Sequence, residues 1–92
     1  MQFVDRRTYR AKTPVNVDGF VNDRTIVHIN SSVGYIQYDG PTVRRGWHKP
    51  VVTREQFEEW ASHDVTEQLP AGCYMTWAQY LQNKQNQKLG IG

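Results

Sequence analysis

The residues around Thr53 constrain the fold most strongly, because they carry a complete helix N-terminus. Thr53 and Gln56 have the spacing of a capping box, in which each side chain accepts a hydrogen bond from the other residue's backbone N–H. Val52 before the cap and Phe57 after it form the matching hydrophobic staple. We therefore expect a helix over residues 53–63, and its apolar face requires another layer of structure beneath it.

The first half of the chain has the pattern of a sheet of short strands. Runs rich in β-branched and aromatic residues are separated by turn signals such as Asp39-Gly40-Pro41. Strands are expected over residues 3–10, 15–21, 25–29, 33–38 and 42–47. Short strands separated by turns favour an antiparallel meander, and an SH3-like, partly closed barrel is the alternative.

A second helix is expected over residues 76–86. Thr76 and Gln79 repeat the capping-box spacing, and Met75 with Tyr80 repeats the hydrophobic staple. The competing interpretation makes residues 73–77 a last strand.

The expected fold class is therefore α+β, in a single domain of residues 1–92. A four- to five-stranded antiparallel sheet over residues 3–48 packs against one or two C-terminal helices. A chain this short buries only about 60–65% of its unfolded surface, so there is little room for a deep, enclosed active site.

No motif in the sequence indicates catalysis or a cofactor. The histidines at positions 28, 48 and 63 lack the spacing of a zinc site. Cys73 is the single cysteine, and a partly buried structural thiol is a better interpretation than a nucleophile. There is no glycine motif for cradling a nucleotide. We expect no enzyme activity, no bound metal and no cofactor.

Cysteine usage and hydropathy predict a cytoplasmic location. One cysteine cannot form an intramolecular disulfide, so a reducing compartment is the simpler setting. No apolar run approaches the length of a membrane span, and residues 1–7 lack the apolar region of a signal peptide. We expect no membrane partner.

Positive charge is concentrated in the first half of the chain. Residues 1–49 contain eight Lys or Arg and four Asp, whereas residues 50–92 contain three Lys or Arg and five acidic residues. The basic half is where an anionic partner would bind, since arginines grip phosphates and exposed aromatic rings stack on unpaired bases. The expected binding residues are Arg6, Arg7, Arg10, Lys12, Tyr35, Arg44, Arg45, Trp47 and Lys49.

A closed barrel would gather these residues by joining its first and last strands. The alternative is that the arginines form an ordinary solvent face and that Tyr35 and Trp47 belong to the core.

The order of parts resembles that of small accessory proteins of tailed bacteriophages. A basic first segment, Asp5-Arg6-Arg7-Thr8-Tyr9-Arg10, leads into a short curled sheet, and Val51-Val52-Thr53-Arg54-Glu55-Gln56-Phe57 then opens a helix. In size and character the chain is also similar to phage anti-CRISPR proteins. The resemblance implies a non-enzymatic protein that inhibits a host protein–nucleic-acid complex, such as a CRISPR surveillance complex, by contacting its protein subunits and its guide RNA or DNA backbone. The alternative is an autonomous DNA- or RNA-binding regulatory module.

Overall fold

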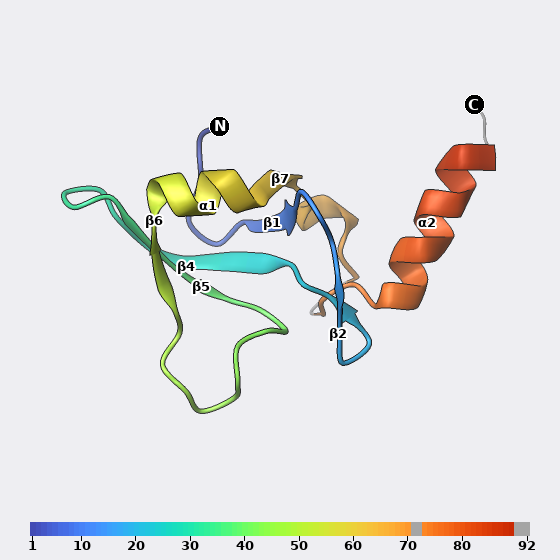
Figure 1. The fold of residues 1–92 in the computed structure, drawn as a ribbon, viewed down its shortest axis with the longest axis horizontal. Coiled ribbons are helices and arrows are strands. Elements are labelled where there is room, and N and C mark those ends of the chain that lie inside the picture. The colour runs from blue at the N-terminus through green and yellow to red at the C-terminus, as the bar shows by residue number, and fades with distance from the viewer. Residues whose placement is uncertain (71–72, 90–92) are drawn as a thin grey trace.

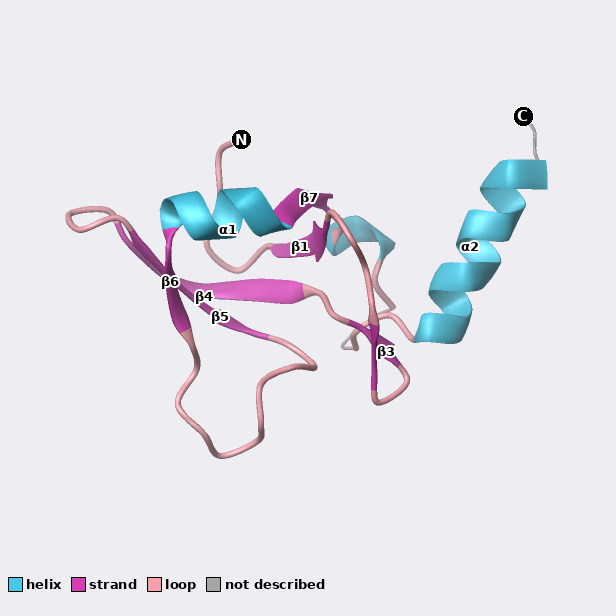
Figure 2. Cartoon of the chain, in the orientation of Figure 1, coloured by secondary structure: helices cyan, strands magenta, loops and turns pink. Residues whose placement is uncertain are grey.

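A computed structural model describes residues 1–70 and 73–89, which form short strands and two α-helices (Figures 1 and 2). The elements in chain order are β1 (Thr8–Ala11), β2 (Asn16–Val17), β3 (Phe20–Val21), β4 (Arg24–Asn30), β5 (Tyr35–Asp39), β6 (Val51–Thr53), α1 (Arg54–Trp60), β7 (Ala61–Asp64), the 3-10 helix η1 (Thr66–Gln68) and α2 (Trp77–Leu89). The predicted α+β class is confirmed.

Five strands form one antiparallel sheet in the order β6-β5-β4-β1-β7, and β2 with β3 forms a separate hairpin. The two edge strands, β6 and β7, are joined in the chain by α1 alone. A seven-residue helix covers about 10 Å, whereas the edges of a flat five-stranded sheet lie about 19 Å apart. The sheet is therefore curled around α1. It is not closed into a barrel, because β6 and β7 are not neighbours in the described sheet.

Aromatic rings fill the space between α1 and the sheet. Phe57 is fully buried at the centre of this core. Its ring centroid lies 4.9 Å from that of Phe3, 5.8 Å from Tyr9, 6.3 Å from Tyr38 and 5.3 Å from Trp60. Two of these four pairs meet edge to face and the other two are tilted, and neither arrangement is the unfavourable face-to-face sandwich. The expectation of an apolar layer beneath the capped helix is confirmed.

The predicted start of α1 is correct and its predicted end is wrong. Thr53 Oγ1 accepts from the N–H of Gln56 at 3.1 Å, and Gln56 Oε1 accepts from the N–H of Thr53 at 2.9 Å. The helix ends at Trp60, and the next four residues form β7 instead of continuing to residue 63. Pairing with β1 supplies backbone partners for this segment and overrides its helical pattern. The sheet consequently extends to Asp64 and not to residue 48.

The first predicted strand is shorter than residues 3–10, because a turn interrupts it. Arg6 has a φ of 67°, and the N–H of Arg7 donates to the carbonyl of Val4 at 3.3 Å. This turn directs Phe3 into the core. The assigned strand therefore begins at Thr8. Arg6 and Arg7 contact β4 through Ile26, whose carbonyl accepts from the N–H of Arg6 at 2.8 Å and whose N–H donates to the carbonyl of Arg7 at 3.0 Å.

The predicted strand over residues 15–21 is a hairpin. Asp18 and Gly19 both have positive φ, 50° and 90°, as the two central residues of a type I′ turn require. Asn16 Oδ1 accepts from the N–H of Gly19 at 2.8 Å and supports the turn.

This hairpin holds the start of α2. The carbonyl of Gly19 accepts from the N–H of Trp77 at 2.8 Å, and Phe20 forms an isolated bridge with Thr76. Thr76 and Gln79 form the predicted capping box, with distances of 3.0 and 3.1 Å. The helix interpretation is confirmed, and the alternative strand over residues 73–77 is reduced to that one bridge.

Candidate binding cleft

The segment over residues 42–47, predicted to be a strand, is a loop built from two consecutive β-turns. The N–H of Val43 donates to the carbonyl of Gly40 at 2.9 Å and closes the first turn. The N–H of Trp47 donates to the carbonyl of Arg44 at 3.1 Å and closes the second. These local bonds replace the pairing that a strand would need, so the strand prediction is wrong here.

Proline and glycine explain why this segment turns. Pro41 occupies the second position of the first turn, where its fixed φ is favoured. Gly46 occupies the third position of the second turn with a φ of 84°, as in a type II turn. Gly40 is buried, and a Cβ atom there would overlap the carbonyl oxygen of Asp23. The base of the loop therefore lies directly against the chain leading into β4.

The loop extends from the sheet on the side away from α1 (Figure 1). It forms one wall of an open cleft with a volume of about 500 Å³. The opposite wall comes from β3 and from the segment before α2. The side chains used below line it from both walls: Arg44, Arg45, Trp47, Lys49, Phe20, Cys73 and Tyr74.

The loop wall is cationic and carries an exposed indole. The side chain of Trp47 is 67% exposed, and Arg44 Cζ lies 5.6 Å from its ring centroid, within cation–π range. Lys49 Nζ lies 4.0 Å from Asp39 Oδ2. Arg44 and Arg45 form no ion pair with any residue that the structure describes. The mouth of the cleft therefore combines an aromatic face with two arginines able to accept an anion.

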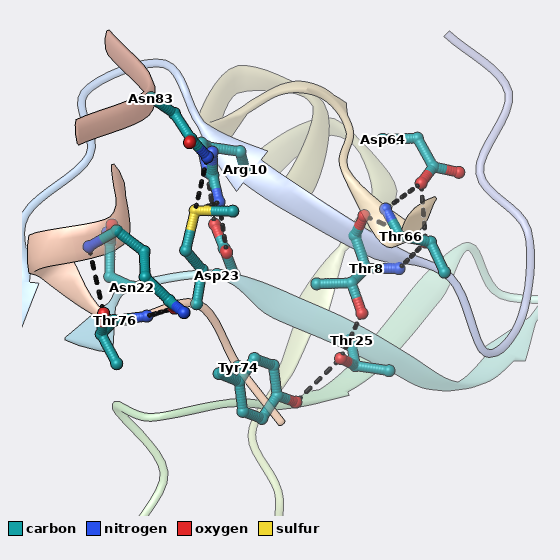
Figure 3. Close-up of polar contacts among 12 residues, drawn as sticks. Thr8, Arg10, Asn22, Asp23, Thr25, Asp64, Thr66, Tyr74, Thr76 and Asn83 are labelled. Carbon is teal, nitrogen blue, oxygen red and sulfur yellow. Dashed lines mark hydrogen bonds and ion pairs between the residues drawn. The ribbon is translucent and has the colours of Figure 1, made fainter. Parts of the chain in front are cut away.

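The opposite wall is fixed to the sheet by a chain of hydroxyl contacts (Figure 3). The Tyr74 hydroxyl lies 2.8 Å from Thr25 Oγ1, and Thr25 Oγ1 lies 2.7 Å from Thr8 Oγ1. Thr66 Oγ1 accepts from the N–H of Thr8 at 2.8 Å. The Tyr74 phenol is protonated at neutral pH, as an ordinary tyrosine is, and burial raises its pKa further. This wall presents a neutral, positioned aromatic ring to the cleft.

Four of the nine predicted binding residues, Arg44, Arg45, Trp47 and Lys49, line this cleft. Arg10 and Lys12 line a separate pocket. Tyr35 is half exposed at the end of β5 away from the cleft, beside β6. The expectation that a closed barrel gathers all nine is therefore wrong, because the sheet is open and β1 lies inside it.

Arg6 and Arg7 lie outside the cleft as well. Arg6 is exposed in the turn before β1. Arg7 Nε donates to Asp64 Oδ2 at 2.7 Å, and its Nη2 donates to Glu67 Oε2 at 2.6 Å. These bonds, that to Glu67 first, raise the pKa of Arg7 above its ordinary value. Arg7, just before β1, thus links that strand to the end of β7 and to η1.

The Arg7–Asp64 contact predicts a dependence of stability on acid. Burial alone would raise the pKa of Asp64, but hydrogen bonds from Arg7 and Thr66 outweigh it and hold that pKa below its ordinary value. A carboxylate with a lowered folded-state pKa stabilises the fold above its unfolded pKa of about 3.9 and loses this contribution as pH falls further.

We therefore expect Asp64→Asn to lower the free energy of unfolding at pH 7 by about 1 kcal/mol or less, since the pair is partly exposed. The difference in free energy of unfolding between the natural protein and the variant, measured by urea unfolding, should shrink as pH falls below about 4. A deficit that stays constant from pH 7 to pH 3 would contradict this account.

Sequence patterns did not reveal the second wall of the cleft. The strand pattern covers Phe20, no motif singles out Tyr74, and Cys73 is predicted to be a partly buried thiol. Cys73 is in fact exposed, so that interpretation is wrong. Long-range contacts bring this wall to the loop, and no local spacing encodes them.

The described residues include no group of three or more His, Cys, Asp or Glu side chains arranged to hold a metal ion. Among the helices in those residues, none has the length and apolar character needed to span a bilayer. Comparisons of the chain with protein-family models, with curated proteins and with solved structures found no match.

Proposed function

We propose that this is a non-catalytic binding protein whose cleft takes an unpaired, phosphate-bearing stretch of nucleic acid. The observation that supports it is the exposed Trp47 ring beside Arg44 at the mouth of the cavity. A free base stacks on such a ring, and neighbouring guanidinium groups bind the phosphates on either side.

The shape of the site favours a single strand over a duplex. Proteins read duplex DNA with a helix or ribbon in a groove and a row of phosphate contacts along it. Here the cations lie along one wall of a single recess of about 500 Å³, which Asp39 also lines, and both walls carry aromatic side chains. An unstacked base fits such a recess, whereas a paired base keeps both of its faces covered by its neighbours.

The more specific form of the proposal follows the resemblance to phage anti-CRISPR proteins. In this form the strand is the guide RNA or target DNA of a host complex, and the protein inhibits that complex by covering it. The exposed carboxylates of α1, at Glu55, Glu58 and Glu59, support it, because they would face the basic subunit surfaces that hold nucleic acid. The alternative is a module that binds free RNA or DNA by itself.

Reversing charge in the loop should remove binding. The variant Arg44→Glu with Arg45→Glu is expected to bind a uridine-rich single-stranded RNA at least about 100-fold more weakly, because two phosphate contacts become repulsions. Fluorescence anisotropy over a range of salt concentrations measures both the affinity and its salt slope. The slope should fall by about 1.4, since single strands contribute about 0.7 per phosphate contact.

The matched control is Arg6→Glu with Arg54→Glu, which changes the net charge equally at exposed positions that do not line the cleft. Equal losses in the two double variants would show that the cleft has no special role. Where free RNA binds weakly to the natural protein, the same pair of variants is compared by co-purification with the host complex. Retention of the loop variant on that complex would overturn the more specific form.

Trp47→Ala tests the stacking contribution separately. Loss of one base–aromatic stack costs about 1–3 kcal/mol, so affinity should fall by roughly 5- to 150-fold. The thermal midpoint should change little, because the ring is 67% exposed. Trp47→Phe should retain a large part of the affinity, and an unchanged affinity in Trp47→Ala would contradict stacking on this ring.

A further inference from the structure

A second pocket lies between β1, β7 and α2 and has a volume of about 300 Å³. It shares no lining residue with the cleft of the β5–β6 loop. Lys12, at the end of β1, and Lys84, on α2, contribute the exposed charges. No acidic side chain is among its lining residues.

One lining residue of this pocket is the buried Arg10, whose guanidinium has an N–H donor group that no described residue uses. The Arg10 side chain is only 7% exposed. Its Nε and Nη2 donate to Asp23 at 3.0 and 2.9 Å, and Nη2 also lies 3.5 Å from Met75 Sδ (Figure 3). The Tyr80 ring covers the guanidinium, with its centroid 5.2 Å from Cζ. Within residues 1–70 and 73–89, Nη1 has no hydrogen-bond partner.

The remaining polar groups around the pocket can also donate. Ser62 and His63 reach it from β7, and Asn83 reaches it from α2. His63 Nδ1 is engaged with Ser62 Oγ at 2.9 Å, which leaves Nε2 for a ligand. The N–H of Lys12 donates to the carbonyl of Trp60 at 2.8 Å, so the backbone that carries this lysine is fixed.

We propose that this pocket binds a phosphate group. Asp23 balances the charge of Arg10, and the two lysines leave an excess of about two positive charges, which matches the charge of −1.5 to −2 on a phosphate monoester at neutral pH. Converging donors from a strand, a second strand and a helix suit the several acceptor oxygens of such a group. The ligand is inorganic phosphate or the terminal phosphate of a nucleotide chain.

The test is an NMR titration of the full chain with inorganic phosphate, exchanged against sodium chloride at constant ionic strength. The backbone amides of Lys12, Ser62 and His63 should shift in a saturable way. In Lys12→Gln with Lys84→Gln, the dissociation constant should rise about tenfold or more, because two charge-assisted bonds are lost. Both lysines are exposed, so this variant should keep the thermal midpoint of the natural protein.

Two results would overturn the proposal: shifts that grow linearly with phosphate, or equal affinity in the double lysine variant. The Arg44→Glu, Arg45→Glu variant should titrate here like the natural protein, so failure of this site and failure of the cleft are distinguishable.

Titrations with uridine 5′-monophosphate and with uridine distinguish the two sources of the phosphate group, a nucleotide chain and the free ion. Tighter binding of the monophosphate than of inorganic phosphate assigns a nucleotide phosphate, and weaker or equal binding assigns the free ion. Uridine that shifts the same amides as strongly as the monophosphate would also overturn the proposal.

Discussion

Asp23→Asn is expected to lower the free energy of unfolding by about 3–5 kcal/mol, because it leaves the Arg10 guanidinium buried without its counter-ion. Asp23 is fully buried, and both of its carboxylate oxygens accept from Arg10. For a domain whose total stability is roughly 5–15 kcal/mol, this is a large fraction. Equilibrium urea unfolding followed by tryptophan fluorescence measures it.

Two further variants separate the cost of leaving one buried charge unpaired from the cost of losing an ion pair in general. Lys49→Gln removes a partner of an exposed pair with a 4.0 Å separation and should cost less than about 1 kcal/mol. Arg10→Met combined with Asp23→Leu removes both charges and should be more stable than Asp23→Asn, since a buried pair is often replaceable by apolar side chains. A cost for Asp23→Asn as small as that for Lys49→Gln would refute this account of the pair.

Phe57→Ala is expected to destabilise the protein by about 3–5 kcal/mol, through lost burial and the cavity that remains. Phe57 is fully buried, and its ring lies between Phe3 and Trp60, with centroid distances of 4.9 and 5.3 Å. Without this ring, α1 loses its main anchor to the sheet. Thermal unfolding by circular dichroism, together with urea titration, measures the loss.

Phe57→Leu preserves part of the volume and should cost about 1.5 kcal/mol, which keeps the measurement possible if the alanine variant does not fold. Val33→Ala is the surface control, because Val33 is well exposed, and a change within about 0.5 kcal/mol is expected. A similar loss in Val33→Ala and Phe57→Ala would contradict a core centred on Phe57.

Local chemistry made the helix starts predictable. The capping boxes at Thr53 and Thr76 lie within four residues of sequence, and both are formed. The strand over residues 25–29 was also evident from its β-branched residues, and it lies inside β4. The end of α1 was not predictable, because pairing with β1, far away in the chain, decides it.

Only the loop wall of the candidate cleft was predictable from the sequence. The cluster of Arg44, Arg45 and Trp47 is visible as composition, and the structure places it on one loop. The turn at Pro41 is predicted correctly from the sequence. The second turn, at Gly46, is not, because the apolar pattern of residues 42–47 favours a strand there. The buried ion pair of Arg10 with Asp23 has no local signal in the sequence, because Arg10 lies in β1 and Asp23 lies 13 positions later, between β3 and β4.

The position of β1 between β4 and β7 has a consequence for the order of folding. The hairpin of β4 and β5 needs only a short turn, whereas Thr8 meets Thr66 across 58 positions of chain. Closing that long segment carries a larger entropic cost, and contacts so distant in sequence slow the search for the native topology. During synthesis on the ribosome, β1 therefore emerges well before its outer neighbour β7. Until then one of its edges stays open to pairing with another nascent chain.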